Sequence, residues 1–142
     1  MEGRDGCQRL LIVDDDPAIR GVMERWFVRR GFIVSVACDG VEAVQQCRTG
    51  TFDLVTMDLE MPRMNGVEAI RVIKRENPEI PVIVVTGYAH GAEALRGETI
   101  EAVLAKPLRM AEIEAAVRAV LDRVRRPSQV NKDPEELCAA LP

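Results

Sequence analysis

Several kinds of site need residues that this chain lacks. It has one histidine among 142 residues, so zinc sites and histidine-based catalytic triads are close to excluded. No CxxC pair and no cysteine beside the histidine is found, which argues against a zinc site or a disulfide framework. The four cysteines are scattered: Cys7, Cys38, Cys47 and Cys138. We expect them to be free thiols in a cytoplasmic protein.

Long apolar runs and an excess of positive charge are also missing. No run approaches the roughly 18 residues that cross a bilayer. The first residues, Met1 to Arg9, are polar and have no signal-peptide pattern. Nineteen Lys and Arg stand against 23 Asp and Glu, a net charge of -4, whereas nonspecific nucleic-acid binding needs a basic face. We therefore expect binding to neither a membrane nor a nucleic acid.

The composition is that of a globular domain. Hydrophobic residues make up 47% and charged residues 30%, which excludes wholesale disorder. The length allows one domain with a core and is too short for two ordinary ones. We assign residues 1–126 to this domain. Residues 127–142 are expected to be a linker-like tail that is disordered or contains a short helix.

Short apolar runs alternate with amphipathic stretches five times. The apolar runs predict buried strands at 10–13, 32–37, 54–57, 81–85 and 102–105. Helices are predicted at 17–30, 40–48, 67–76 and 110–125, with a short one at 92–97. The run at 81–85 is the most apolar, so we expect it to form the central strand.

Five strand–helix units predict an α/β fold, a doubly wound parallel sheet with helices on both faces, because each parallel crossover returns over a face. Right-handed crossovers leave few topologies, of which we choose the flavodoxin-like strand order 2-1-3-4-5. Such sheets bind ligands at the carboxyl ends of their strands, near the switch point between the first and third strands.

Carboxylates follow two strands that are expected to be neighbours. The first strand ends in Asp14, Asp15 and Asp16, and the third ends in Asp58. We expect Asp16 to cap the helix that follows it. Like charges a few ångströms apart repel by roughly 1 kcal/mol even in water, so the other three predict a bound cation. Carboxylate oxygens favour Mg²⁺ or Ca²⁺ over zinc, and Mg²⁺ commonly keeps a phosphate oxygen as a ligand.

Two more polar side chains are expected at the same edge of the sheet. The fourth strand ends in Thr86, and the fifth is followed by Lys106. A phosphoryl group in transfer carries negative charge on its oxygens, which a metal ion, a hydroxyl and an ammonium group can stabilise. The combination predicts a phosphoryl site. His90 lies past this edge in a glycine-rich loop and is expected at the surface, without a chemical role.

Four motifs follow one another along the chain: LLIVDDDPAIR, DLVTMDLEMPRMNG, PVIVVTGYA and LAKPL. In this order they resemble the response-regulator receiver family of two-component signalling, from about Arg9 to Val124. The resemblance implies that the chain accepts a phosphoryl group from a histidine kinase or histidine phosphotransfer protein and signals through protein contacts. It implies no enzymatic activity beyond this transfer and slow autodephosphorylation. It also implies that the chain is a monomer or a weak homodimer.

The resemblance also implies a role for each acidic residue of the cluster. Asp58 would be the phosphoacceptor. Asp15 would ligate Mg²⁺ directly, with Asp14 acting through water, and the backbone carbonyl of Glu60 would complete the protein's share of the metal shell.

Further roles are implied for residues at the ends of the fourth and fifth strands. Thr86 would be the hydroxyl that moves to meet the phosphoryl group, and Lys106 would be the ion-pair partner of that group. The Lys106–Pro107 bond is expected to be cis, which X-Pro bonds permit.

Three positions bear on output or on phosphoryl lifetime. Val103 stands where many receivers have an aromatic residue that turns inward on activation. Tyr88 and Glu60 occupy positions that would modulate the lifetime of the phosphoryl group.

Val103 motivates a second hypothesis, an interaction module that works without phosphorylation. A further alternative is a receiver fragment of a hybrid sensor kinase or of a larger regulator.

Enzymes of related fold are disfavoured. A haloacid-dehalogenase-type phosphatase would need Thr after the acid that stands at Glu60, and Met61 follows instead. A flavodoxin-type nucleotide site would need a phosphate-cradling loop where three aspartates stand.

Overall fold

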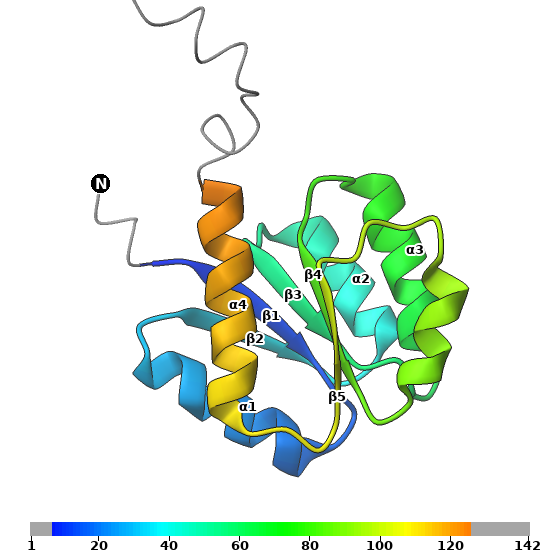
Figure 1. The fold of residues 1–142 in the computed structure, drawn as a ribbon. Coiled ribbons are helices and arrows are strands. Elements are labelled where there is room, and N and C mark those ends of the chain that lie inside the picture. Colours follow the sequence, from blue (N-terminus) through cyan, green and yellow to red (C-terminus); the bar gives the residue numbers. More distant parts are fainter. Residues whose placement is uncertain (1–6, 126–142) are drawn as a thin grey trace, which may run out of the picture.

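Five parallel strands form one sheet in the order β2-β1-β3-β4-β5, as the sequence predicts (Figure 1). The computed structural model describes residues 7–125. Its elements are β1 (Arg9–Val13), α1 (Pro17–Arg29), β2 (Ile33–Ala37), α2 (Gly40–Thr49), β3 (Leu54–Met57), α3 (Gly66–Glu76), β4 (Val82–Thr86), the 3₁₀ helix η2 (Ala89–Leu95), β5 (Ala102–Ala105) and α4 (Met110–Arg125). The predicted tail at 127–142 lies outside the described residues.

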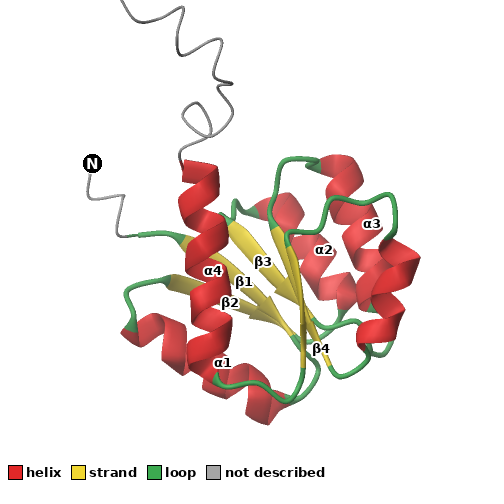
Figure 2. Cartoon of the chain, viewed as in Figure 1, coloured by secondary structure: helices red, strands yellow, loops and turns green. Residues whose placement is uncertain are grey.

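Helices cover both faces of the sheet (Figure 2). Successive side chains of a strand point to opposite faces. In β1, Leu11 and Val13 therefore belong to the core under α2 and α3. Leu10 and Ile12 belong to the core under α1 and α4. The sheet is thus buried on both sides, which explains why its strands are continuous apolar runs in the sequence.

Two sequence predictions about the fourth unit need correction. β3, not the strand at 82–86, lies in the middle of the sheet. All five residues of β4 are nevertheless buried, because helices cover both faces of this strand. A continuous apolar run therefore indicates that both faces of a strand are covered, not that the strand lies in the middle of the sheet. The short helix begins at Ala89 rather than at residue 92, with Gly91 N donating a hydrogen bond to Tyr88 O at the first turn.

Side chains cap the starts of two helices, and the first of these caps was predicted from the sequence. The Asp16 side chain accepts a hydrogen bond from Ala18 N and caps α1, with Pro17 in the first turn. Asn65 and Glu68 form a capping box at the start of α3. These caps fix where each helix leaves the edge of the sheet that carries the acidic residues.

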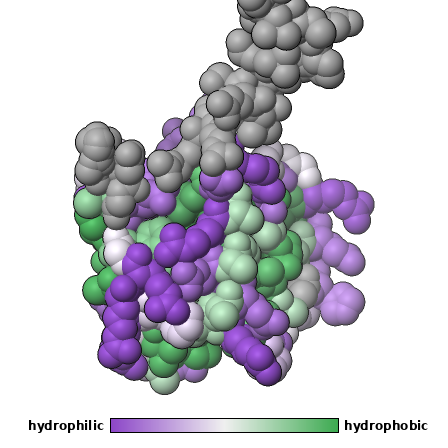
Figure 3. Space-filling view, turned by 60° about the vertical axis from the view of Figure 1, so that its left-hand side comes forward, coloured by the Kyte–Doolittle hydropathy of each residue, from purple (hydrophilic) through white to green (hydrophobic). Residues whose placement is uncertain are grey.

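Polar and apolar side chains share the surface. In the space-filling view, hydrophobic patches lie among hydrophilic side chains, and neither kind covers the face that is seen (Figure 3). Cys7, Cys38 and Cys47 are free cysteines, and Cys138 lies outside the described residues. Among residues 7–125, no helix is long and apolar enough to span a membrane.

Candidate functional site

The sheet brings three aspartates together at the carboxyl ends of its strands. Val13 of β1 pairs with Met57 of β3, so the residues that follow leave neighbouring strands at the same level. Asp58 N donates a hydrogen bond to Val13 O at 3.1 Å. One oxygen each from Asp14, Asp15 and Asp58 lies within 4.8 Å of the others. Hence the arrangement is a set of hard oxygen donors open to a divalent cation.

Lys106 lies between two of these carboxylates. Its Nζ is 2.7 Å from Asp14 Oδ2 and 3.4 Å from Asp58 Oδ2. The backbone positions it, because Lys106 N donates to Thr86 O at the end of β4. The Lys106–Pro107 bond is cis, as expected.

The three aspartates differ in their surroundings. Asp14 and Asp58 are buried, with 2% and 6% of their surface exposed, whereas Asp15 is exposed. Both oxygens of Asp14 are engaged, one by Lys106 and the other by Asp16 N at 2.9 Å. The contacts of Asp58 are longer: 3.4 Å to Lys106 and 3.3 Å from Glu60 N. Asp58 is therefore the more weakly held of the two buried carboxylates.

Burial and charge shift the pKa values of the pair that Lys106 forms with Asp14. Burial raises the pKa of Asp14, and the hydrogen bond from Lys106 offsets this only in part. Burial also acts to lower the pKa of Lys106, but the hydrogen bond and charge of Asp14 outweigh it and raise that pKa. Lys106 is thus protonated at neutral pH and supplies one positive charge beside three acidic groups. The remaining negative charge favours the binding of a further cation.

The hydroxyl of Thr86 is buried near this cluster. Thr86 has no exposed surface, and its Oγ1 accepts a hydrogen bond from Tyr88 N at 3.1 Å. The ring-bearing residue Tyr88 is half exposed, and Glu60 is exposed on the loop after β3.

Two residues singled out in the sequence lie outside the cluster. Val103 is 43% exposed on β5, at the edge of the sheet. His90 is exposed on η2, as expected.

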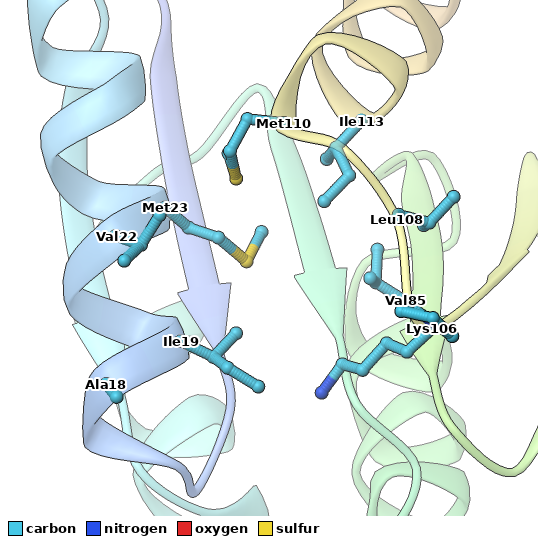
Figure 4. A pocket seen from close by; sticks show the side chains of 10 residues that line it. Ala18, Ile19, Val22, Met23, Val85, Lys106, Leu108, Met110 and Ile113 are labelled. Carbon is cyan, nitrogen blue, oxygen red and sulfur yellow. The ribbon is translucent and has the colours of Figure 1, made fainter.

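An apolar groove, which was not predicted from the sequence, lies beside the cluster. It has a volume of about 560 Å³ and lies between α1 and the segment from Lys106 into α4. In the close-up, Met23 of α1 points toward Met110 and Ile113 of α4, and Ile19 lies across from Lys106 (Figure 4). Because Lys106 lines both the groove and the cluster, the two adjoin. Val22, an apolar position of α1, lines the groove and is 44% exposed, which only the structure shows.

Known sequences match most of the chain. A model described as response regulator receiver domain matches residues 10–118. The response regulator MprA of Mycobacterium ulcerans is 34% identical over 119 residues, which are 82% of this chain and 51% of that protein. MprA of Mycobacterium sp. strain KMS is 35% identical over 117 residues, 81% of this chain and 51% of that protein. The chain spans about half the length of the curated relatives it matches.

Solved structures match the fold over nearly their whole length. A CheY-like receiver domain protein from Methanospirillum hungatei has a TM-score of 0.82 and 26% identity, and the match covers 85% of this chain and 98% of that one. TrrA of Thermotoga maritima, solved with Mg²⁺ and BeF, has a TM-score of 0.73 and 28% identity, covering 79% and 97%. The receiver domain of a sensor histidine kinase from Pseudomonas aeruginosa, with a magnesium ion in its active site cleft, has a TM-score of 0.74 and 27% identity, covering 81% and 98%.

Proposed function

Since the chain belongs to the response regulator receiver domain family of two-component signalling, we propose that Asp58 is its phosphoacceptor, in a Mg²⁺-dependent reaction. The observation that carries this proposal is the contrast between the two buried carboxylates. Both Asp14 oxygens are held by short contacts, whereas those of Asp58 are held at 3.3 Å and 3.4 Å. Asp58 therefore keeps an oxygen available for attack.

The residues of the cluster fit Mg²⁺. Asp14, Asp15 and Asp58 offer converging carboxylate oxygens, and the Glu60 carbonyl, on the loop after β3, would add a fourth oxygen. A bound Mg²⁺ would neutralise negative charge on the phosphoryl oxygens. The two relatives described with Mg²⁺, TrrA and the Pseudomonas receiver domain, support this assignment.

The chemistry follows from the charges of the side chains. An Asp58 oxygen attacks the phosphorus of a phosphohistidine, the P–N bond breaks, and the nitrogen keeps the bonding electrons. Lys106 is close enough to Asp58 to pair with the transferred group. Thr86 would reach it once its Oγ1 leaves the hydrogen bond with Tyr88 N. Water later takes the phosphoryl group from Asp58 and releases inorganic phosphate.

The donor would be a histidine kinase or a histidine phosphotransfer protein. A phosphohistidine has to approach Asp58 on the side chain of a partner, so the partner must contact the surface beside the site. The apolar groove between α1 and α4 adjoins the site through Lys106 and is suited to such a contact. Signalling rather than enzymatic turnover is the general role of the family.

Intact-mass analysis after incubation with acetyl phosphate tests the proposal. We expect wild type to gain one phosphoryl group with Mg²⁺ and none when the ion is chelated. Asp58→Asn should gain none. Asp16→Asn is the matched control, since it changes an exposed aspartate at the same edge and Asn still caps α1; it should behave as wild type. An adduct of wild-type extent on Asp58→Asn would contradict the assignment. No adduct on wild type would favour the module that works without phosphorylation.

A further inference from the structure

The loop between β3 and α3, residues 59–65, is tied to the start of α2 by an ion pair. Arg63 Nε donates a hydrogen bond to Asp39 Oδ2 at 2.7 Å, and a terminal nitrogen of the guanidinium group lies 2.6 Å from the same oxygen. The other oxygen of Asp39 accepts a hydrogen bond from Glu42 N and caps α2. The Asp39 carboxylate is buried, while the Arg63 side chain is 57% exposed. A buried carboxylate on a fixed helix end thus holds an exposed residue of the loop.

The backbone around this pair is constrained as well. Arg63 has φ of 65°, a left-handed conformation that residues other than glycine rarely adopt. Next to it, Gly40 N donates to Met64 O at 2.9 Å, and a Cβ on Gly40 would lie 2.3 Å from that oxygen. A left-handed conformation such as that of Arg63 persists where the surrounding contacts hold it in place.

The same loop reaches the carboxylate cluster at its other end. Glu60 N contacts Asp58 Oδ1 at 3.3 Å, and the proposed function gives the Glu60 carbonyl to Mg²⁺. The side chain of Arg63 forms its hydrogen bond and ion pair with Asp39 rather than with the cluster, so any effect of Arg63 on the site must pass through the loop.

We propose that Arg63 and Asp39 are positioning residues that hold the β3–α3 loop in the shape that completes the Mg²⁺ site. This inference rests on the proposed function, because it assumes that the cluster binds Mg²⁺. It adds that the affinity for the ion is set partly by the ion pair between this loop and the start of α2. Residues that orient metal ligands without touching the metal ion typically contribute about tenfold or more to its affinity.

An effect of charge alone and an effect of loop positioning predict opposite changes in Mg²⁺ affinity when Arg63 is replaced. Removing the positive charge of Arg63 would, by long-range electrostatics, strengthen the binding of a cation, and removing the negative charge of Asp39 would weaken it. If the pair positions the loop, losing either partner weakens binding. The Arg63 variants are therefore the decisive ones.

Calorimetric titration of the full chain with Mg²⁺ is the test. We expect Arg63→Ala, Arg63→Gly and Asp39→Asn each to weaken affinity by about tenfold. Arg63→Gly relieves the backbone conformation while removing the guanidinium group, so it separates the ion pair from strain. Asp39→Asn keeps a residue that caps helices well. The double variant Arg63→Ala with Asp39→Asn should be no weaker than either single variant.

Arg48→Ala is the matched control. Arg48 at the end of α2 pairs with Glu76 at the end of α3, with the closest nitrogen and oxygen 2.6 Å apart. The variant removes the same charge and an ion pair between neighbouring helices, at their ends away from the loop. It should bind Mg²⁺ as wild type does.

A second measurement needs no metal. Amide hydrogen exchange in the loop of the Mg²⁺-free protein should be faster in Arg63→Ala and Asp39→Asn than in wild type and Arg48→Ala. Wild-type or stronger Mg²⁺ affinity in Arg63→Ala and Arg63→Gly, or unchanged loop exchange, would overturn the inference and leave the proposed function standing. If wild type itself binds no Mg²⁺, the proposed metal site and this inference are both wrong.

Discussion

At the scale of single residues, Gly66 allows the start of α3 to approach the end of β3 closely. It is the first residue of α3, and its N donates to Leu59 O at 3.0 Å. A Cβ at this position would lie 2.1 Å from the carbonyl oxygen of Asp58, a backbone atom that cannot rotate away. The absence of a side chain therefore allows α3 to begin directly against the residue after β3.

We predict that Gly66→Ala destabilises the fold by about 1–3 kcal/mol, the range for overpacking. In an unhindered helix the same change would be stabilising, by up to about 1 kcal/mol, so the contact reverses the usual sign. Urea unfolding of both proteins measures the difference.

Gly87→Ala is the control for this variant. No heavy atom lies within 4 Å of the place where its Cβ would be, so we expect a change within about 0.5 kcal/mol. Equal losses in the two variants would show that the contact with Asp58 O does not set the cost.

The sequence predicted which residues meet at this edge but not how they pair. Strand ends and spacing were enough to place Asp14, Asp58 and Lys106 together. They could not show that Lys106 lies closer to Asp14 than to Asp58, because that depends on side-chain geometry across three strands. The sequence alone does not single out Gly66, because its backbone comes close to Asp58 O only after folding.

At the scale of elements, a cluster around Glu114 joins α1 to α4. Glu114 accepts hydrogen bonds from Trp26 Nε1 and Arg30 Nε, both at 2.9 Å. Arg118, one turn along α4, donates to its other oxygen at 2.8 Å. The guanidinium group of Arg30 also lies 4.1 Å from the centre of the Trp26 ring. Hydrogen bonds from Arg118 and Arg30 lower the pKa of Glu114 to about 2.

The link between α1 and α4 should weaken in acid. Because the folded pKa of Glu114 is below its ordinary 4.5, its contribution to stability is complete above about pH 4.5 and is lost as pH falls toward 2. We predict that wild type is more stable than Glu114→Gln at pH 6 and that the difference shrinks between about pH 4.5 and 2. Unfolding free energies measured across this range test it. A difference that stays constant down to pH 2 would contradict the assigned cause.

Elements that show a clear apolar run or a long amphipathic repeat in the sequence were predicted well. The strands at 54–57 and 102–105 and the helix at 110–125 have the predicted bounds. The fourth unit was predicted less well, because η2 is a 3₁₀ helix without a long amphipathic repeat and because cover on both faces makes β4 as apolar as a central strand.

At the scale of the whole molecule, the groove adjoins the cluster that contains Asp58, the proposed phosphoacceptor, because Lys106 lines the groove and contacts Asp58. The groove lies between two helices that are separated in the sequence by residues 30–109, so its existence depends on tertiary packing and was not predicted. Val22 is exposed at this groove, and Val28, on the same helix, is 52% exposed and is not among the residues that line it.

We predict that Val22→Asp slows phosphorylation by a phosphohistidine donor by about tenfold or more, because it places a charge on an apolar contact surface. Phosphorylation by acetyl phosphate should be unchanged, since a small donor needs no groove. The donor is chosen by screening autophosphorylated histidine kinases for transfer to wild type.

Val28→Asp is the matched control and should accept phosphate from both donors at the wild-type rate. If Val22→Asp and Val28→Asp slow transfer from the kinase equally, the groove is not the contact surface. If Val22→Asp also slows the reaction with acetyl phosphate, the substitution has altered the site itself.

The most direct test of the central claim is to locate the phosphoryl group on the chain. Borohydride reduces an aspartyl phosphate to homoserine, and peptide mass mapping then identifies the position. After treatment with acetyl phosphate and Mg²⁺, we predict homoserine at position 58 alone. Homoserine at position 14 or 15, or none at any position, would contradict the assignment of Asp58 as the phosphoacceptor.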